Sequence, residues 1–170
     1  MLVRNWVIAS ILIVLVFALH TLTLASGIPD HLEISDLAIE TVNGERYEFR
    51  VYEAATPADR SRGLMYVDKL GDREGMIFDS GNNVMASIWM KNTPIPLDVL
   101  FLTADGRISS IENDMTPYSR KTVSSREPVR AVLEINGGLC RKLGIRSGDR
   151  VLHHYFNNMR NEDAAQEAGS

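Results

Sequence analysis

The chain has one cysteine in 170 residues, Cys140, so it cannot form an intramolecular disulfide. This excludes a small scaffold held together by disulfides. Positive charge is also scarce, because 18 Lys and Arg residues stand against 22 Asp and Glu residues and give a formal net charge of −4. An acidic chain offers no electrostatic basis for binding nucleic acid. The sequence contains neither a glycine-rich phosphate loop nor a serine nucleophile elbow.

Long apolar runs are confined to the N-terminus, where residues 6–19 are apolar except for Ser10. Arg4 precedes this run, and Thr23 and Ala25 supply small residues at the −3 and −1 positions of a cleavage site. The pattern predicts an export signal over residues 1–25 and a periplasmic or otherwise extracytoplasmic protein. The segment is also long enough for an uncleaved membrane anchor over residues 6–25, and both interpretations stay open.

The remainder has the length of one compact domain, which we place at residues 31–156. Residues 157–170 are polar, have little apolar surface to bury, and are expected to form a disordered tail. A membrane contact is therefore expected only through the N-terminal segment, if it is not cleaved.

The domain is expected to consist of short strands joined by turns. Asn43-Gly44 is a hairpin signal, and residues 47–52 alternate between apolar and polar side chains, as a half-buried strand does. Thr56-Pro57-Ala58-Asp59 has the cap and first-turn residues of a short helix. Asp79 to Asn83 is a cluster of turn formers.

The C-terminal half continues this pattern. Strands are expected at residues 97–102, 108–111, 129–135 and 150–156, with a short helix ending at Leu143. There is no βαβ rhythm. The sequence thus predicts a mainly β fold, a single compact antiparallel β barrel or sandwich with one or two short helices.

Several motifs occur in a fixed order along this domain. They are Thr56-Pro57 with Arg62-Gly63-Leu64-Met65, then Gly75-Met76-Ile77-Phe78, then Trp89-Met90-Lys91-Asn92-Thr93 with Pro96-Leu97-Asp98, and finally Val132-Leu133-Glu134-Ile135-Asn136-Gly137 with Gly148-Asp149. The ordered set resembles the DUF192 family of bacterial and archaeal proteins. The resemblance implies a small, usually exported β-rich domain with no assigned reaction, cofactor or partner. Family members often carry an arginine shortly after the Gly-Leu-Met, where this chain has Tyr66 and Val67.

The segment from Trp89 to Asp98 combines an aromatic ring, a cation, an amide, a hydroxyl and a carboxylate within an apolar stretch. Such a mixture is typical of a binding pocket, in which the ring stacks on a ligand and the cation holds an anion. Arg62 on the preceding predicted helix and Glu134 in an apolar strand could face the same pocket. The candidate ligand-binding residues are Arg62, Trp89, Lys91, Asn92, Thr93, Asp98 and Glu134.

A structural interpretation of the same residues stays open. Asn92 and Thr93 would then satisfy backbone groups at a bend. Lys91 would pair with Asp98 or Glu134, and the arginine of the short helix would form a similar salt bridge.

The leading functional hypothesis is a non-enzymatic domain that binds a small polar or anionic ligand, or a protein of the cell envelope. One alternative is a cell-envelope hydrolase or lyase that uses Glu134 or Asp98 as acid or base. Another is a structural or assembly factor without a small-molecule site.

No cofactor and no metal site are expected. Adjacent histidines on a strand point to opposite faces, so His153 and His154 should not share an ion. The methionines show no ligand spacing. Cys140, at helical spacing from Leu139 and Leu143, is typical of a small buried hydrophobic residue rather than a nucleophile.

Overall fold

A computed structural model of the chain describes residues 27–159. The predicted export signal, and all but the first three residues of the predicted tail, lie outside this range. Among the described residues, none of the helices has the length and apolar character needed to cross a bilayer. The elements are β1 (Ile34–Glu40), β2 (Arg46–Glu53), α2 (Pro57–Arg62), β3 (Glu74–Val84), β4 (Ser87–Ile88), β5 (Leu97–Leu102), β6 (Ile108–Met115), β7 (Val123–Ser124), β8 (Val129–Asn136), α3 (Leu139–Leu143), β9 (Arg150–Leu152) and the 3₁₀ turn η1 (His154–Phe156).

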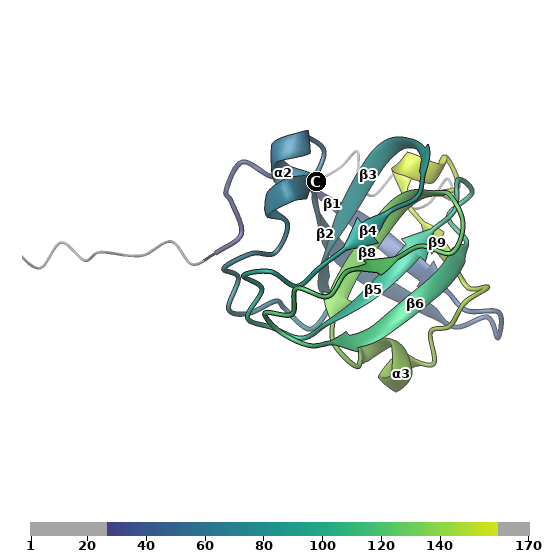
Figure 1. Cartoon of the computed structure of the whole chain (residues 1–170). Coiled ribbons are helices and arrows are strands. Elements are labelled where there is room, and N and C mark those ends of the chain that lie inside the picture. Colours follow the sequence, from purple (N-terminus) through teal and green to yellow (C-terminus); the bar gives the residue numbers. More distant parts are fainter. Residues whose placement is uncertain (1–26, 160–170) are drawn as a thin grey trace, which may run out of the picture.

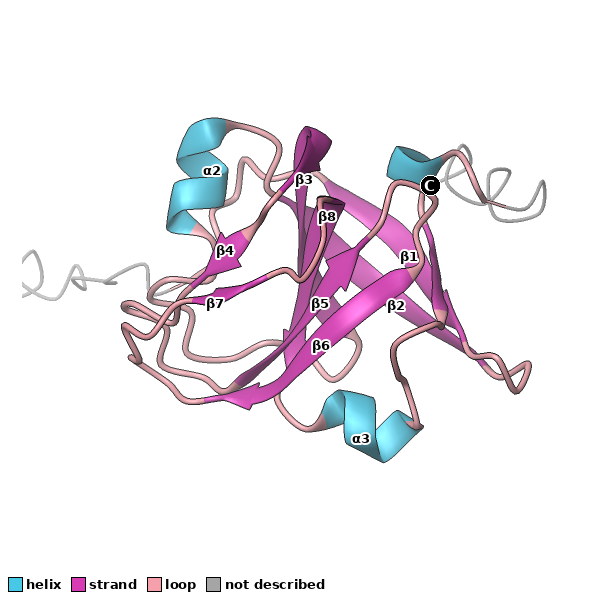
Figure 2. Cartoon of the chain, turned by 45° about the vertical axis from the view of Figure 1, so that its right-hand side comes forward, coloured by secondary structure: helices cyan, strands magenta, loops and turns pink. Residues whose placement is uncertain are grey.

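The main sheet has the strand order β6-β5-β8-β3-β2-β1-β9 and curls into a half-barrel (Figures 1 and 2). Its two edge strands approach each other, since the backbone N–H of Ile108 donates to Asp149 and that of Val151 donates to Gly106, both at 2.8 Å. The short strands β4 and β7 form a separate pair. The prediction of a mainly β fold with short helices is confirmed.

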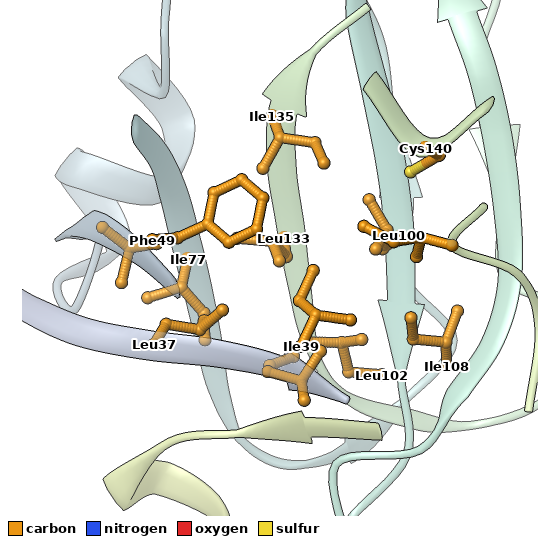
Figure 3. Packing of buried hydrophobic residues seen from close by; sticks show 14 of the residues in the cluster. Leu37, Ile39, Phe49, Ile77, Leu100, Leu102, Ile108, Leu133, Ile135 and Cys140 are labelled. Carbon is orange, nitrogen blue, oxygen red and sulfur yellow. The ribbon is translucent and has the colours of Figure 1, made fainter. Parts of the chain in front are cut away.

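Both faces of the curled sheet are covered with apolar side chains. The first core cluster fills the inside of the curl and includes Leu37, Ile39, Phe49, Ile77, Leu100, Leu102, Ile108, Leu133, Ile135 and Cys140 (Figure 3). The second cluster lies on the opposite face and includes Leu64, Met76, Phe78, Met90, Leu97, Val99, Phe101 and Val132. Neighbouring residues of one strand therefore enter different cores, as the strand period of two requires.

One pair of strands departs from the antiparallel pattern. β2 and β3 run parallel, and the connection between them passes through α2. Parallel neighbours need such a crossover, since a tight hairpin joins only antiparallel strands. The predicted antiparallel arrangement did not include this one parallel pair, because a single six-residue helix gives no repeating βαβ pattern in the sequence.

The short helix α2 begins with a complete capping box. The Thr56 side chain accepts from the N–H of Asp59 at 3.1 Å, and the Asp59 carboxylate accepts from the N–H of Thr56 at 3.3 Å. Pro57 takes the first helical position, where its missing N–H costs nothing. This cap fixes where the helix begins and hence the position of the arginines in its last turn.

We expect Thr56→Ala to lower the free energy of unfolding by about 1 kcal/mol, the usual cost of losing a threonine N-cap. Chemical denaturation measures the change. Thr116→Ala, in a loop on another part of the domain, serves as the control and should change stability by less than about 0.5 kcal/mol. Equal effects of the two substitutions would contradict the role given to the cap.

Three of the predicted element boundaries are wrong. The strand predicted at residues 108–111 continues as β6 to Met115. Residues 79–83 are not a separating turn, because β3 continues through them to Val84 with an irregular register against β8. The final strand ends at Leu152 instead of continuing to Phe156, and the chain then forms η1. His153 accepts the N–H of Tyr155 and so begins this turn, which changes the direction of the histidine side chains.

Candidate functional site

A pocket of about 260 Å³ lies between α2, β3, β8 and the segment that follows β4. The short β4–β7 pair lies beside α2, and this places the segment after β4 across from the end of the helix (Figure 2). The lining residues are Arg60, Ser61, Arg62, Gly63, Leu64, Met65, Phe78, Ser87, Ile88, Trp89, Lys91, Thr93 and Glu134. Three of these side chains are cations and one is a carboxyl group.

The helical side of the pocket depends on a close approach at Gly63. This residue follows α2 with φ of 49°, and a Cβ atom there would lie 3.2 Å from the Phe78 ring. Glycine permits both the positive φ and the contact. This close packing places Arg60 and Arg62, near the end of α2, at the pocket that Phe78 also lines.

The opposite side is formed by residues 89–93, which alternate in direction. Trp89, Lys91 and Thr93 line the pocket, whereas Met90 is fully buried in the second core. The Lys91 Nζ lies 5.1 Å from the centre of the Trp89 ring, within the range of a cation–π interaction. Trp89 is 46% exposed, so it offers a large part of its surface to a ligand.

The bend that follows is fixed by Asn92. Its backbone has a φ of 57°, a conformation that asparagine tolerates better than most residues. Its side-chain amide donates to the Tyr66 hydroxyl at 2.7 Å, and its carbonyl accepts the N–H of Tyr66 at 2.8 Å. Asn92 thus ties the two loops that border the pocket and does not line it.

Glu134 lies at the base of the pocket on β8. It is only 5% exposed, and its strand neighbours are Met76 on β3 and Val99 on β5, both fully buried. Among residues 27–159 no hydrogen bond or ion pair reaches its carboxyl group. Burial without a partner raises the pKa of Glu134 to about 8. The group is therefore mostly protonated at neutral pH and can donate a hydrogen bond into the pocket.

Five of the seven residues predicted from the sequence therefore meet at this pocket: Arg62, Trp89, Lys91, Thr93 and Glu134. Within the described part of the chain, Lys91 forms no salt bridge with Asp98 or Glu134, and Arg62 contacts only the carbonyl of Gly27, at 3.4 Å. The structural alternative of a buried ion pair is accordingly wrong for these residues.

Asp98 lies apart from the pocket, on the face of the sheet that carries the first core. Its fully buried carboxylate accepts three backbone N–H groups, those of Asp114 at 2.7 Å, Gly138 at 2.9 Å and Cys140 at 2.7 Å. These bonds hold the chain that enters α3. Cys140 is buried there, and burial raises the pKa of its thiol, which agrees with a packing role.

Eight of the thirteen pocket residues were not among the predicted candidates, including Arg60, Phe78 and Ser87. Residues two positions apart on a helix do not share a face, so no local pattern predicts that Arg60 joins Arg62 at the pocket. The contribution of Phe78 depends on how α2 packs on β3, and that of Ser87 on the β4–β7 pair, which have no local signal.

The sequence model of the family described as "Uncharacterized ACR, COG1430", DUF192, matches residues 38–153. No curated protein matches the chain. The structure is similar to that of a protein of unknown function from Novosphingobium aromaticivorans DSM 12444, with 41% identity and a TM-score of 0.71 over 75% of this chain and 91% of the other. It is also similar to a proposed transcription regulator from Sinorhizobium meliloti 1021, with 36% identity and a TM-score of 0.73 over 75% of this chain and 99% of the other.

Proposed function

We propose that this chain, which belongs to the DUF192 family of uncharacterised proteins, binds a small ligand with an anionic group in the pocket between α2 and residues 89–93. The observation that carries the proposal is Glu134, a buried carboxyl group without a partner that faces a pocket lined by three cations. Buried polar groups in proteins are ordinarily satisfied. Among the described residues, the fully enclosed polar atom without a partner is Ser110 Oγ, whereas the Glu134 carboxyl group borders the pocket. A ligand that accepts a hydrogen bond from Glu134 would give this group the partner that it lacks.

The lining residues differ in chemistry, so each favours a different part of the ligand. Arg60, Arg62 and Lys91 favour a carboxylate, phosphate or sulfate group. The partly exposed ring of Trp89 favours a flat or apolar portion of the ligand next to that group. The protonated Glu134 favours a neutral acceptor, such as a carbonyl or ether oxygen, at the far end.

The proposal includes a compartment, outside the cytoplasm, in which the ligand is bound. If residues 1–25 direct export, the ligand is met outside the cytoplasm, in solution or presented by a protein of the cell envelope. The description of one relative as a proposed transcription regulator suggests DNA binding instead. The net charge of −4 argues against this role for the present chain, because DNA binding depends on a positive surface.

To test the proposal, the protein would be purified under mild conditions and examined by native mass spectrometry for a bound small molecule. Calorimetry would then compare glucuronate with glucose, and phosphomonoesters with the corresponding alcohols. We expect only the anionic member of each pair to bind. Lys91→Ala should weaken binding at least about tenfold, the scale of a lost charged hydrogen bond. Lys142→Ala, on α3 at the far end of the molecule, is the matched control (Figure 1).

Glu134 gives the same experiment a second readout. Because the protonated acid binds, the affinity should fall about tenfold between pH 7 and pH 9, as the group ionises through its pKa of about 8. Glu134→Gln keeps a donor of the same shape and should bind without this pH dependence. Equal binding of charged and neutral probes, or the same pH profile in Glu134→Gln, would show that the pocket does not act in this way.

A second candidate, hydrolysis or elimination with Glu134 as general acid, is favoured by one observation. A glutamic acid with a pKa of about 8 stands in the same pocket as Lys91 and Arg62, which could stabilise developing negative charge. Asp98 takes no part in this version, since its oxygens are held by backbone N–H groups on the other face. Turnover of a bound probe that disappears in Glu134→Gln would distinguish catalysis from binding.

A further inference from the structure

Three potential metal-binding side chains meet where β2 and β9 end, away from the pocket described above. They are Glu53, the last residue of β2, and the consecutive residues His153 and His154. The expectation that the two histidines face apart is wrong, because the strand stops before them. Their rings lie 4.1 Å apart, centre to centre, and are tilted by 35°.

The spacing of the three side chains suits one small ion. The Nε2 atoms of His153 and His154 lie 3.8 Å and 3.5 Å from Oε1 of Glu53. One ligand atom from each residue can be chosen so that all lie within 4.8 Å of one another. Ligand atoms around a tetrahedral zinc ion lie about 3.4 Å apart, given bonds of about 2.0–2.1 Å. Small side-chain rotations would bring the three atoms to that spacing.

The contact of Glu53 with His153 is not a hydrogen bond. The His153 ring is fully buried, and its Nε2 lies 3.8 Å from Oε1 of Glu53, beyond hydrogen-bond range. Glu53 is also buried, at 7% exposure, and its other oxygen, Oε2, accepts the hydroxyl of Tyr155. That hydrogen bond orients the carboxylate, as partners of metal ligands commonly do.

The surroundings attract a cation. A hollow of about 530 Å³ adjoins Glu53 and His154, and it is also lined by Glu33, Asp36 and Arg50. Three carboxylates against one guanidinium leave this hollow with an excess of negative charge. The His154 side chain is 42% exposed, so an ion can reach the cluster from solvent.

Ion binding exchanges existing hydrogen bonds for metal bonds. The Nε2 atom of His153 lies 2.8 Å from the Ser35 hydroxyl, and its Nδ1 accepts the N–H of Tyr155 at 3.4 Å. If an ion takes Nε2, the Ser35 hydroxyl loses this partner and can turn to solvent in the hollow or to the ion's remaining ligand, the ring proton moves to Nδ1, and the contact with Tyr155 is given up. That contact is longer than the usual N–H···acceptor range, so its loss costs little.

We propose that Glu53, His153 and His154 bind one divalent transition-metal ion of the zinc type. Two imidazoles and one carboxylate form a ligand set that catalytic zinc and related ions use, with the remaining position left to water or another ligand. That position would face the hollow beside Glu33 and Asp36. This site is separate from the anion pocket, so neither proposal depends on the other.

The test uses the untagged full chain after treatment with a chelator. Addition of Co²⁺ is expected to produce the visible absorption bands of a tetrahedral ion at a stoichiometry of one. Zn²⁺ should displace the Co²⁺, and calorimetry gives its affinity. His154→Ala removes a partly exposed ligand without opening the core, and it should weaken Zn²⁺ binding at least about 100-fold, since even the loss of a ligand's partner costs 10–100-fold.

His31→Ala is the matched control. His31 is exposed and contacts Asp59 at 2.8 Å, outside the three-residue cluster, and its loss should leave Zn²⁺ affinity unchanged. Glu53→Gln adds a second ligand variant, which circular dichroism would check for folding. Absence of Co²⁺ bands and of Zn²⁺ binding in the wild type would overturn the proposal. Equal Zn²⁺ affinities of His154→Ala and His31→Ala would overturn it as well.

Discussion

Replacing Asp98 by alanine is expected to lower the free energy of unfolding by about 4 kcal/mol or more. The substitution leaves the N–H groups of Asp114, Gly138 and Cys140 without their acceptor, the first two in a partly buried place and the third in a fully buried one. Each buried donor that loses its partner costs about 1–3 kcal/mol. Since marginal domains have only about 5–15 kcal/mol in total, the variant should unfold at much lower denaturant concentration or fail to accumulate.

Urea denaturation measures this effect, and Asp98→Asn refines it. The asparagine side chain has the same shape, but its NH₂ group would face backbone donors, so it should recover only part of the lost stability. Asp114→Asn is the control, because that carboxylate is about half exposed and contacts the exposed Arg141 at 3.2 Å. An exposed ion pair contributes about 0–1 kcal/mol. If Asp98→Ala were no more harmful than Asp114→Asn, the three hydrogen bonds would not hold this part of the fold.

Glu134 should have the opposite effect on stability, and the size of that effect should depend on pH. Glu134→Gln is expected to be more stable than the wild type by roughly 4 kcal/mol at pH 8 and above, but nearly equal to it at pH 4.5. The reason is that the pKa of Glu134 rises from 4.5 to about 8 on folding, and each pKa unit corresponds to about 1.4 kcal/mol.

The sign follows from proton binding. Below pH 4.5 the group is protonated in both states and contributes nothing. Between pH 4.5 and pH 8 the unfolded chain releases the proton while the folded chain retains it, so the wild type loses stability as the pH rises. Above pH 8 both states are ionised, and the difference between the wild type and the glutamine variant becomes constant.

Urea denaturation at pH 5, 6.5 and 8 measures the difference in the free energy of unfolding between Glu134→Gln and the wild type. Taking the difference removes the contribution of the other ionisable groups, which both proteins share. Glu112→Gln, a partly exposed glutamate on β6, is the control and should follow the wild type at every pH. The raised pKa of Glu134 would be refuted if the difference in the free energy of unfolding between Glu134→Gln and the wild type stayed constant from pH 5 to pH 8.

These two carboxyl groups lie on adjacent strands and yet have opposite environments. Asp98 is the β-sheet partner of Ile135, and Glu134 is the partner of Val99, so they are nearly side by side along the β5–β8 pair. Asp98 accepts three backbone N–H groups, whereas Glu134 lies among apolar neighbours and borders the pocket. An unsatisfied buried acid lowers stability, and this is the pattern expected where a site is kept for binding or catalysis.

The local sequence determined much of the fold. Alternation of apolar residues, the Asn43-Gly44 turn and the Thr56 cap were enough to predict the β1–β2 turn, β2, β5–β6, β8 and the beginning of α2, because these signals act over a few residues. The ordered motifs from Thr56 to Asp149 were enough to predict the family. They also selected five of the thirteen pocket residues, among them Trp89, Lys91 and Thr93, which lie close together in the chain.

Only the tertiary structure decided which face each polar residue occupies. Alternation separates the two faces of a strand, but both faces of this sheet are buried, so it could not tell Asp98 from Glu134. The parallel β2–β3 crossover brings α2 to the pocket, and the end of β9 at Leu152 turns His153 and His154 together. These outcomes depend on contacts between segments far apart in the sequence, where short-range patterns carry no information.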